Sequence, residues 1–164
     1  METENLKKKL QNTPNFYPYD SKADTLEHIK RVNELLSKAA IELINRGNRH
    51  DDSKLRAPEK ELFDEMTPML KNLTFGTPEY QASLDKLAPA LDHHYKNNSH
   101  HPQFYIEGVN GMDLFDIMEM FFDWKAAGER TKDGNIMKSI AINKDRFGLS
   151  DQLVKIFENT ANRL

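Results

Sequence analysis

The fold is decided by residues 113–127, whose sequence is DLFDIMEMFFDWKAA. Wound as a helix, this stretch is apolar around most of its circumference, and only a narrow strip is polar. A helix that is apolar nearly all round lies inside a protein rather than on its surface. The stretch therefore predicts a central buried helix that other helices surround.

The surrounding helices follow from apolar residues that recur at helical spacing. Gly47 is expected just past the end of the first one, Ser150 is expected to cap the last, and Pro89 is expected to kink or end the third. Sustained strand alternation is lacking, so the sequence predicts an all-α fold. We expect an irregular arm at residues 1–20 and a single compact bundle of about five to six helices over residues 21–164. The expected helices cover residues 21–46, 58–70, 78–94, 113–127, 136–147 and 153–162.

Composition narrows the classes of function. The 164 residues suit one domain, and a formal net charge of -3 gives no general basic field for nucleic acid or for an anionic membrane. The chain has no cysteine, which excludes disulfides, thiolate metal sites and a cysteine nucleophile. No leader-like segment or membrane-length apolar run is visible, so the cytoplasm is the expected compartment. The sequence does not indicate whether the protein forms an oligomer.

Histidine is the unusual residue, because four of the six histidines fall within residues 93–101. His94 continues an apolar stripe along its helix and is expected to point inward, whereas His93 is rotated away from that stripe. His28 lies at the edge of the apolar stripe of residues 21–46 and is expected to be at least half buried. Each inward ring is either a metal ligand or a core histidine with one hydrogen bond.

Three carboxylates, those of Asp116, Glu119 and Asp123, share the polar strip of residues 113–127. Like charges at this spacing repel one another, and burial of an unpaired carboxylate is costly, so a cation is expected against the strip. The candidates are a metal ion, Arg130 and Lys54. The alternative is a solvated face, although such faces usually mix both signs of charge and this one is acidic throughout.

The doublet His50-Asp51 is followed three residues later by Lys54. Imidazole and carboxylate are the usual metal ligands where thiolates are absent, and adjacent His and Asp residues can reach one ion from a turn. A His-Asp dipeptide is common by chance. It becomes informative here because histidines precede and follow it, and an acidic helix comes after them.

The order His, His-Asp, His, His, Asp within residues 28–123 resembles the HD-domain superfamily, all-α proteins that are mostly metal-dependent phosphohydrolases. Three strings are similar to a small uncharacterised family of bacterial and bacteriophage proteins: HDDSK (50–54), HHYKNNSHHP (93–102) and MEMFFDW (118–124). The superfamily resemblance implies that Asp51 can bridge two ions. The core metal ligands that it implies are His28, His50, Asp51 and Asp123.

Further polar residues complete the set of candidates. His94 and one or both of His100 and His101 match the extra histidines of two-metal members. Lys54 matches a position where such members often keep a lysine. It is expected to contact a phosphate oxygen, and the alternative is an ion pair with Asp51, Asp52 or Glu119. Glu119 is expected either to orient a ligand histidine or to replace Asp123 as a ligand. The candidates for orienting a ligand or contacting the substrate are His93, Asp116, Glu119 and Arg130.

The expected function is a metal-dependent phosphohydrolase that acts on a nucleotide or another small phosphate ester. Two divalent ions (Mn, Fe, Co, Ni, Mg or Zn) would activate a bridging water as hydroxide, with Asp51 and Lys54 as the catalytic residues. The alternatives are a di-iron oxygenase with the same ligands and a non-catalytic module that binds a metal or another ligand. The substrate, the metal and the oligomeric state do not follow from the sequence.

Overall fold

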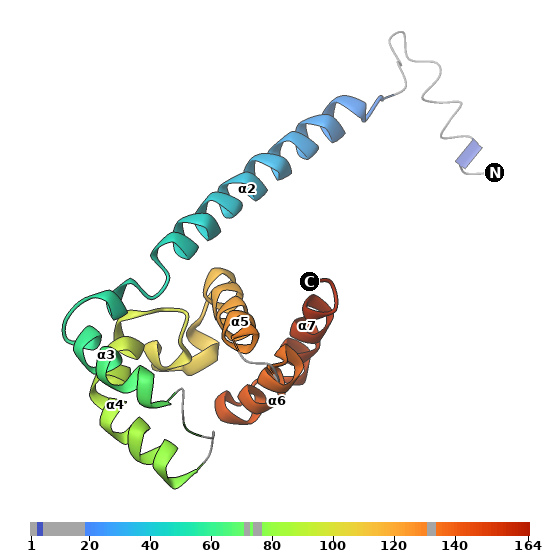
Figure 1. Ribbon diagram of the computed structural model, residues 1–164. Coiled ribbons are helices and arrows are strands. Elements are labelled where there is room, and N and C mark those ends of the chain that lie inside the picture. The colour runs from blue at the N-terminus through green and yellow to red at the C-terminus, as the bar shows by residue number, and fades with distance from the viewer. Residues whose placement is uncertain (1–2, 5–18, 71–72, 74–76, 131–133) are drawn as a thin grey trace. The chain divides into compact units, whose positions relative to one another are not determined.

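The computed structural model describes residues 3–4, 19–70, 73, 77–130 and 134–164. Every regular element in these ranges is a helix and none is a strand, which confirms the all-α prediction (Figure 1). The chain divides into two compact units, residues 1–41 and 42–164, each described by itself. Most of the expected N-terminal arm lies outside the described residues. None of the described helices is long and apolar enough to cross a membrane.

The first long helix, α2 (Lys22–Arg49), runs from the first unit into the second. Asp20 accepts a hydrogen bond from the Lys22 backbone N–H at 2.9 Å just before the helix begins. The helix does not end at Gly47, which lies inside it, so that expectation is wrong. The chain turns instead at Asp51, whose backbone adopts the left-handed conformation (φ 59°) that glycine usually provides after a helix.

The second unit contains a pair formed by α3 (Glu59–Leu70) and α4 (Pro78–Asn97). The two helices pack around buried Met66, Leu87 and Ala90. Pro89 lies within α4, and the helix continues past it to Asn97 instead of ending there. The residues after Pro89 form the last turn of α4, which contains His93 and His94.

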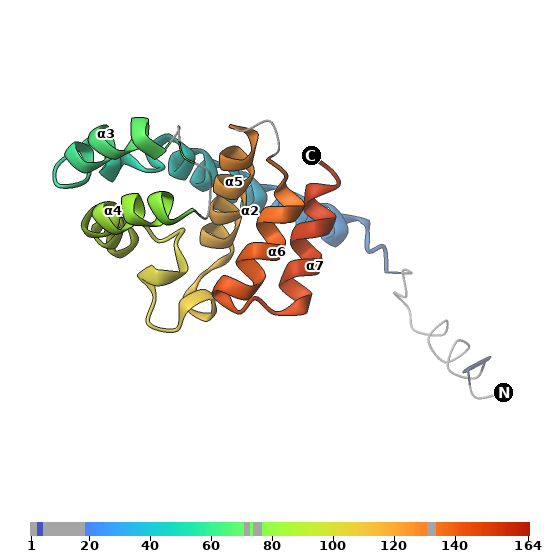
Figure 2. The ribbon, with the colours of Figure 1, turned by 60° about the horizontal axis from the view of Figure 1, so that its bottom comes forward.

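The other layer of the second unit consists of α5 (Leu114–Glu129), α6 (Ile136–Phe147) and α7 (Asp151–Ala161). Both ribbon views show α6 beside α7, with α5 next to them (Figure 2). Their shared core consists of Met120, Phe121, Trp124, Ile140, Leu149 and Phe157. The hydroxyl of Ser150 caps α7 by accepting the Leu153 backbone N–H at 3.2 Å, as the sequence predicts.

The helix α5 is exposed along one strip of its surface, so the prediction of a helix surrounded on all sides is wrong. Met120, Phe121 and Trp124 face α6 and α7, whereas Met118 and Phe122 are exposed. Between α4 and α5 the chain forms two short 3-10 helices, η2 (Pro102–Phe104) and η3 (Gly108–Gly111), where the sequence predicts only a loop. Another 3-10 helix, η1 (Asp52–Leu55), joins α2 to α3.

Candidate metal centre

Side chains from four segments of the second unit converge on Asp51. His50 and Asp51 directly follow α2, and His94 comes from the last turn of α4. The loop after α4 contributes a pair of histidines, and α5 contributes a carboxylate. The six residues brought together are His50, Asp51, His94, His100, His101 and Asp123.

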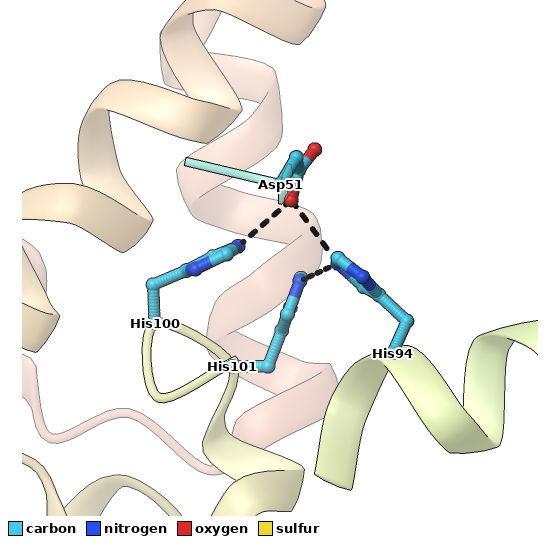
Figure 3. A group of neighbouring side chains, drawn as sticks. All are labelled: Asp51, His94, His100 and His101. Carbon is cyan, nitrogen blue, oxygen red and sulfur yellow. Dashed lines mark hydrogen bonds and ion pairs between the residues drawn. The ribbon is translucent and has the colours of Figure 1, made fainter. Parts of the chain in front are cut away.

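The first group of ligand atoms surrounds Oδ1 of Asp51 (Figure 3). This oxygen lies 3.2 Å from Nε2 of His94 and 3.5 Å from Nε2 of His100. Nε2 of His101 lies 2.9 Å from Nε2 of His94. One ligand atom from each of the four residues lies within 4.8 Å of all the others, so a single cation can contact all of them.

The second group surrounds Oδ2 of the same carboxylate. Nε2 of His50 lies 3.5 Å from Asp51 Oδ2 and 3.6 Å from Asp123 Oδ1. These three residues again place their ligand atoms within 4.8 Å of one another. The two oxygens of Asp51 therefore face two different sets of ligands.

The donor set fits a divalent metal ion. Oδ1 of Asp51 and Nε2 of His100 are both buried without a hydrogen-bond partner. An unsatisfied buried polar atom costs about 1–3 kcal/mol, so native structures rarely leave two of them facing each other. Imidazole nitrogens and carboxylate oxygens are the ligands that Zn, Fe, Mn and similar ions use, and such an ion would satisfy both atoms.

Glu59 orients His94 from the side away from this cluster. Its carboxylate is completely buried and accepts hydrogen bonds from Nδ1 of His93 at 2.7 Å and Nδ1 of His94 at 3.0 Å. It also accepts the hydroxyl of Ser53 at 3.0 Å. An ionised carboxylate cannot donate, so the hydrogen of His94 lies on Nδ1 and its Nε2 lone pair faces the cluster.

Glu119 performs the same function for two other histidines. Its Oε1 accepts from Nδ1 of His50 at 2.8 Å and lies 3.1 Å from Nδ1 of His100. The Nε2 atoms of both rings therefore point toward Asp51. Three of the four clustered histidines are held by carboxylates behind them, which is the arrangement that fixes metal-binding imidazoles.

Arg46 is the cation that lies against the acidic strip of α5. Its guanidinium lies 2.5 Å from Asp116 Oδ1 and 2.7 Å from Glu119 Oε2, so the strip is not a solvated face. Asp116 is 2% exposed and also accepts the hydroxyls of Ser99 and Tyr105. The expected alternatives, Arg130 and Lys54, lie elsewhere: Arg130 is at the C-terminal end of α5, and Lys54 contacts Asp51.

The charges within the cluster shift one another's pKa values. The facing carboxylates of Asp123 and Glu119 raise the pKa of His50 to about 10. Burial would raise the pKa of Asp51, but the facing histidines and Lys54 hold it well below its ordinary value. Burial together with the neighbouring His100 and His94 lowers the pKa of His101 to about 3. The cluster thus keeps its carboxylates ionised and His101 neutral at neutral pH.

The remaining predicted site residues fall in three places. Lys54 lies at the edge of the cluster, with its ammonium 2.6 Å from Asp51 Oδ2. His93 is turned to Glu59 and belongs to none of the three His and carboxylate groups. His28 lies on the part of α2 that belongs to the first unit, which is described by itself, so its role as a ligand stays a prediction.

The sequence model of a family of unknown function (DUF5662) matches residues 18–163. The chain belongs to this family. Neither a curated protein nor a solved structure matches it. Because the family has no assigned function, the function of this member is argued from the site itself.

Sequence reasoning missed two important residues, Glu59 and Arg46. Arg46 precedes His50 by four residues, so its place on the same helix face was a usable signal. Glu59 stands in the polar string PEKE (residues 58–61), which reads as the exposed first turn of a helix. The sequence offers no local sign that this glutamate is buried against two histidines.

Proposed function

We propose that this chain is a metal-dependent phosphohydrolase that acts on a small phosphate ester. The main support is that one oxygen of Asp51 faces His94 and His100 while the other faces His50. A carboxylate with ligands on both sides can bridge two cations, and paired divalent ions are common in enzymes that hydrolyse phosphate esters. The resemblance to the HD-domain superfamily supports the same class of reaction.

Two divalent ions from the set Mn, Fe, Co, Ni, Mg and Zn would lower the pKa of a bound water and offset negative charge on the phosphate. The protein residues supply orientation and further charge. Glu59 and Glu119 keep Nε2 of their histidines directed at Asp51. The ammonium of Lys54 is a third exposed and can bind a phosphate oxygen as a point charge beside Asp51.

Metal content tests the proposal directly. Protein purified without chelators is analysed for bound metal as the wild type and as the Asp51→Asn and Asp52→Asn variants. Asp52 is the matched control, because it is adjacent in sequence and belongs to none of the ligand groups. We expect stoichiometric metal in the wild type and in Asp52→Asn, and a loss of metal in Asp51→Asn, which removes the bridging charge.

Activity is then measured on phosphate monoesters, nucleoside phosphates and cyclic dinucleotides with added Mn²⁺, Co²⁺ or Ni²⁺. We expect hydrolysis that depends on the metal and disappears in Asp51→Asn. The proposal fails if the wild type and His50→Ala both lack stoichiometric metal and melt at the same temperature. Bound iron with a visible charge-transfer band and no hydrolysis would instead identify a di-iron oxygenase. Bound metal with neither activity would indicate a binding module.

A further inference from the structure

A cavity of about 340 Å³ lies beside the second ligand group. His50 and Asp123 form its wall toward Asp51, and the last turns of α2 and the second half of α5 form the rest. Its apolar lining comes from Leu43, Phe122 and Ala126. The volume lies within the range of small-molecule sites, which is about 300–1,000 Å³. We refer to this cavity as the recess.

The charged groups that line the recess are already paired with one another. The guanidinium of Arg46 binds Asp116 and Glu119, and the imidazole of His50 lies 2.8 Å from Glu119 Oε1 and 3.6 Å from Asp123 Oδ1. Among the described lining residues, none therefore offers a free charge to a charged group of a ligand. The part of a ligand that enters the recess is therefore neutral and apolar.

Gly47 leaves open space along one wall of the recess. It lies inside α2, where glycine is less favourable than alanine, and a Cβ added there would meet no atom within 4 Å. The packing of the protein thus gives no reason for a glycine at this position. Its backbone forms part of the recess wall, so the missing side chain leaves room for a group that approaches the helix closely.

Phe122 favours an aromatic ring as the part of the ligand that enters the recess. Its ring is 43% exposed and lies in the recess wall, where it offers apolar surface to a ring of a ligand. The polar side chains of Arg46 and Glu119 already bind each other, so few partners remain for the amino, carbonyl and hydroxyl groups of a nucleoside. A flat apolar ring suits these walls better than a nucleobase with its sugar.

We propose that the recess binds the apolar aromatic part of a phosphate monoester whose phosphate faces the cluster around Asp51. This inference rests on the proposed hydrolase and specifies its substrate class. Water attacks the phosphorus, the bond from phosphorus to the ester oxygen breaks, and the aromatic alcohol leaves with a proton while inorganic phosphate forms. No oxidant or second substrate is required.

The test compares phenylphosphonate with methylphosphonate, two analogues that cannot be hydrolysed, by calorimetry in the presence of Mn²⁺. We expect phenylphosphonate to bind at least about tenfold more tightly, as burial of a ring predicts. Ala126→Leu fills the recess and should abolish the preference. Ala127→Leu is the matched control, because Ala127 is the next residue on α5, is exposed and does not line the recess.

A second variant guards against misfolding. Gly47→Ala should raise the melting temperature, because alanine favours the helix, and should still weaken phenylphosphonate more than methylphosphonate. The inference is overturned if the two phosphonates bind equally to the wild type, or if Ala126→Leu keeps the preference.

A neutral probe separates this inference from the proposed hydrolase. Benzyl alcohol, added without metal and followed by NMR, should shift signals of Phe122 and Ala126 in the wild type and leave those of Phe122 unchanged in Ala126→Leu. If benzyl alcohol binds while phosphonate binding does not depend on metal, the hydrolase proposal fails and the recess stands as an aromatic site. If methyl and phenyl phosphate are hydrolysed with equal KM, the hydrolase stands and the recess inference fails.

Discussion

The substitution Glu59→Gln tests whether the carboxylates behind the histidines set the chemistry of the cluster. Glu59 is fully buried and accepts three hydrogen bonds, from Ser53, His93 and His94. A glutamine keeps the shape but replaces one acceptor oxygen with an NH₂ group. If that donor takes the place of Oε2, His94 must carry its hydrogen on Nε2 and cannot bind a metal. If it takes the place of Oε1 and faces His93, His94 keeps its tautomer but loses the carboxylate that makes its Nε2 a stronger ligand. Both orientations of the amide weaken metal binding.

The expected magnitude follows from the contacts that are lost. Substitutions behind a metal-binding histidine typically reduce metal affinity by about 10–100-fold, equivalent to about 1.4–2.8 kcal/mol. Hydrogen bonds to a charged group contribute about 1.5–3 kcal/mol and those between neutral groups about 0.5–1.5 kcal/mol. We therefore expect the free energy of unfolding without metal to fall by about 1–3 kcal/mol as well.

The assay is a competition titration of Mn²⁺ or Zn²⁺ against a chromophoric chelator, together with urea denaturation in excess chelator. Glu65→Gln is the matched control, because Glu65 lies on the same helix and is exposed. It should leave both affinity and stability unchanged. If Glu59→Gln binds metal as tightly as the wild type, this carboxylate does not set the strength of His94 as a ligand and the reasoning is refuted.

Three further predictions concern other parts of the cluster. Asp123→Ala should lose metal. Asp116→Ala should keep metal but lose about 1.5–3 kcal/mol of stability, because it removes a buried carboxylate that is hydrogen-bonded to the half-buried Arg46. Metal analysis and urea denaturation distinguish the two, and the reverse pattern would mean that the wrong carboxylate was assigned. Lys54→Ala should retain metal and lower kcat by about 100-fold, because it removes a positive charge beside a phosphate oxygen. Unchanged turnover would mean that Lys54 is only an ion-pair partner of Asp51. The pKa of His50 is raised to about 10, so its stabilising charge is fully present below about pH 6.5 and is lost as pH rises through 10. A metal ion must displace this proton to bind His50, so metal affinity should increase by up to about tenfold per pH unit between pH 7 and 9. Calorimetry in buffers of different ionisation enthalpy measures the proton that is released. Metal binding without proton release would contradict this prediction.

The helices were predictable wherever their signals are local. The expected range 136–147 coincides with α6, because both its apolar spacing and its flanking residues are contained within the segment. The end of α2 was misplaced because Gly47 is the residue type that usually follows a helix. The actual turn uses a left-handed aspartate, Asp51, and an aspartate in that conformation has no distinctive sequence pattern.

The degree of burial of α5 could not be read from its composition. An apolar circumference shows that a helix can be buried, but which side packs depends on where its neighbours lie. Here α6 and α7 cover the side of Phe121 and Trp124, and Phe122 is left to line the recess. A residue that looked like core thus lies in the wall of a ligand-sized cavity.

The candidate ligands were predictable because their chemistry restricts the residue types. Histidines and aspartates in a chain without cysteine have few other reasons to cluster, and the structure brings six of the seven predicted ligands together. The supporting residues are different, because Glu59 and Arg46 belong to the commonest surface types. Their burial results from contacts with residues 35 and 70 positions away in the sequence.

The paired carboxylates restrict how this protein can change during evolution. Glu59 and Glu119 each hold two histidines, so loss of one histidine leaves a charged oxygen in the interior without its donor. A descendant that abandons metal binding would therefore be destabilised by its first substitution and stabilised again only when the glutamate is replaced as well. Among relatives, His94 and Glu59 should be lost together, and chains that keep the glutamate without the histidine should be rare.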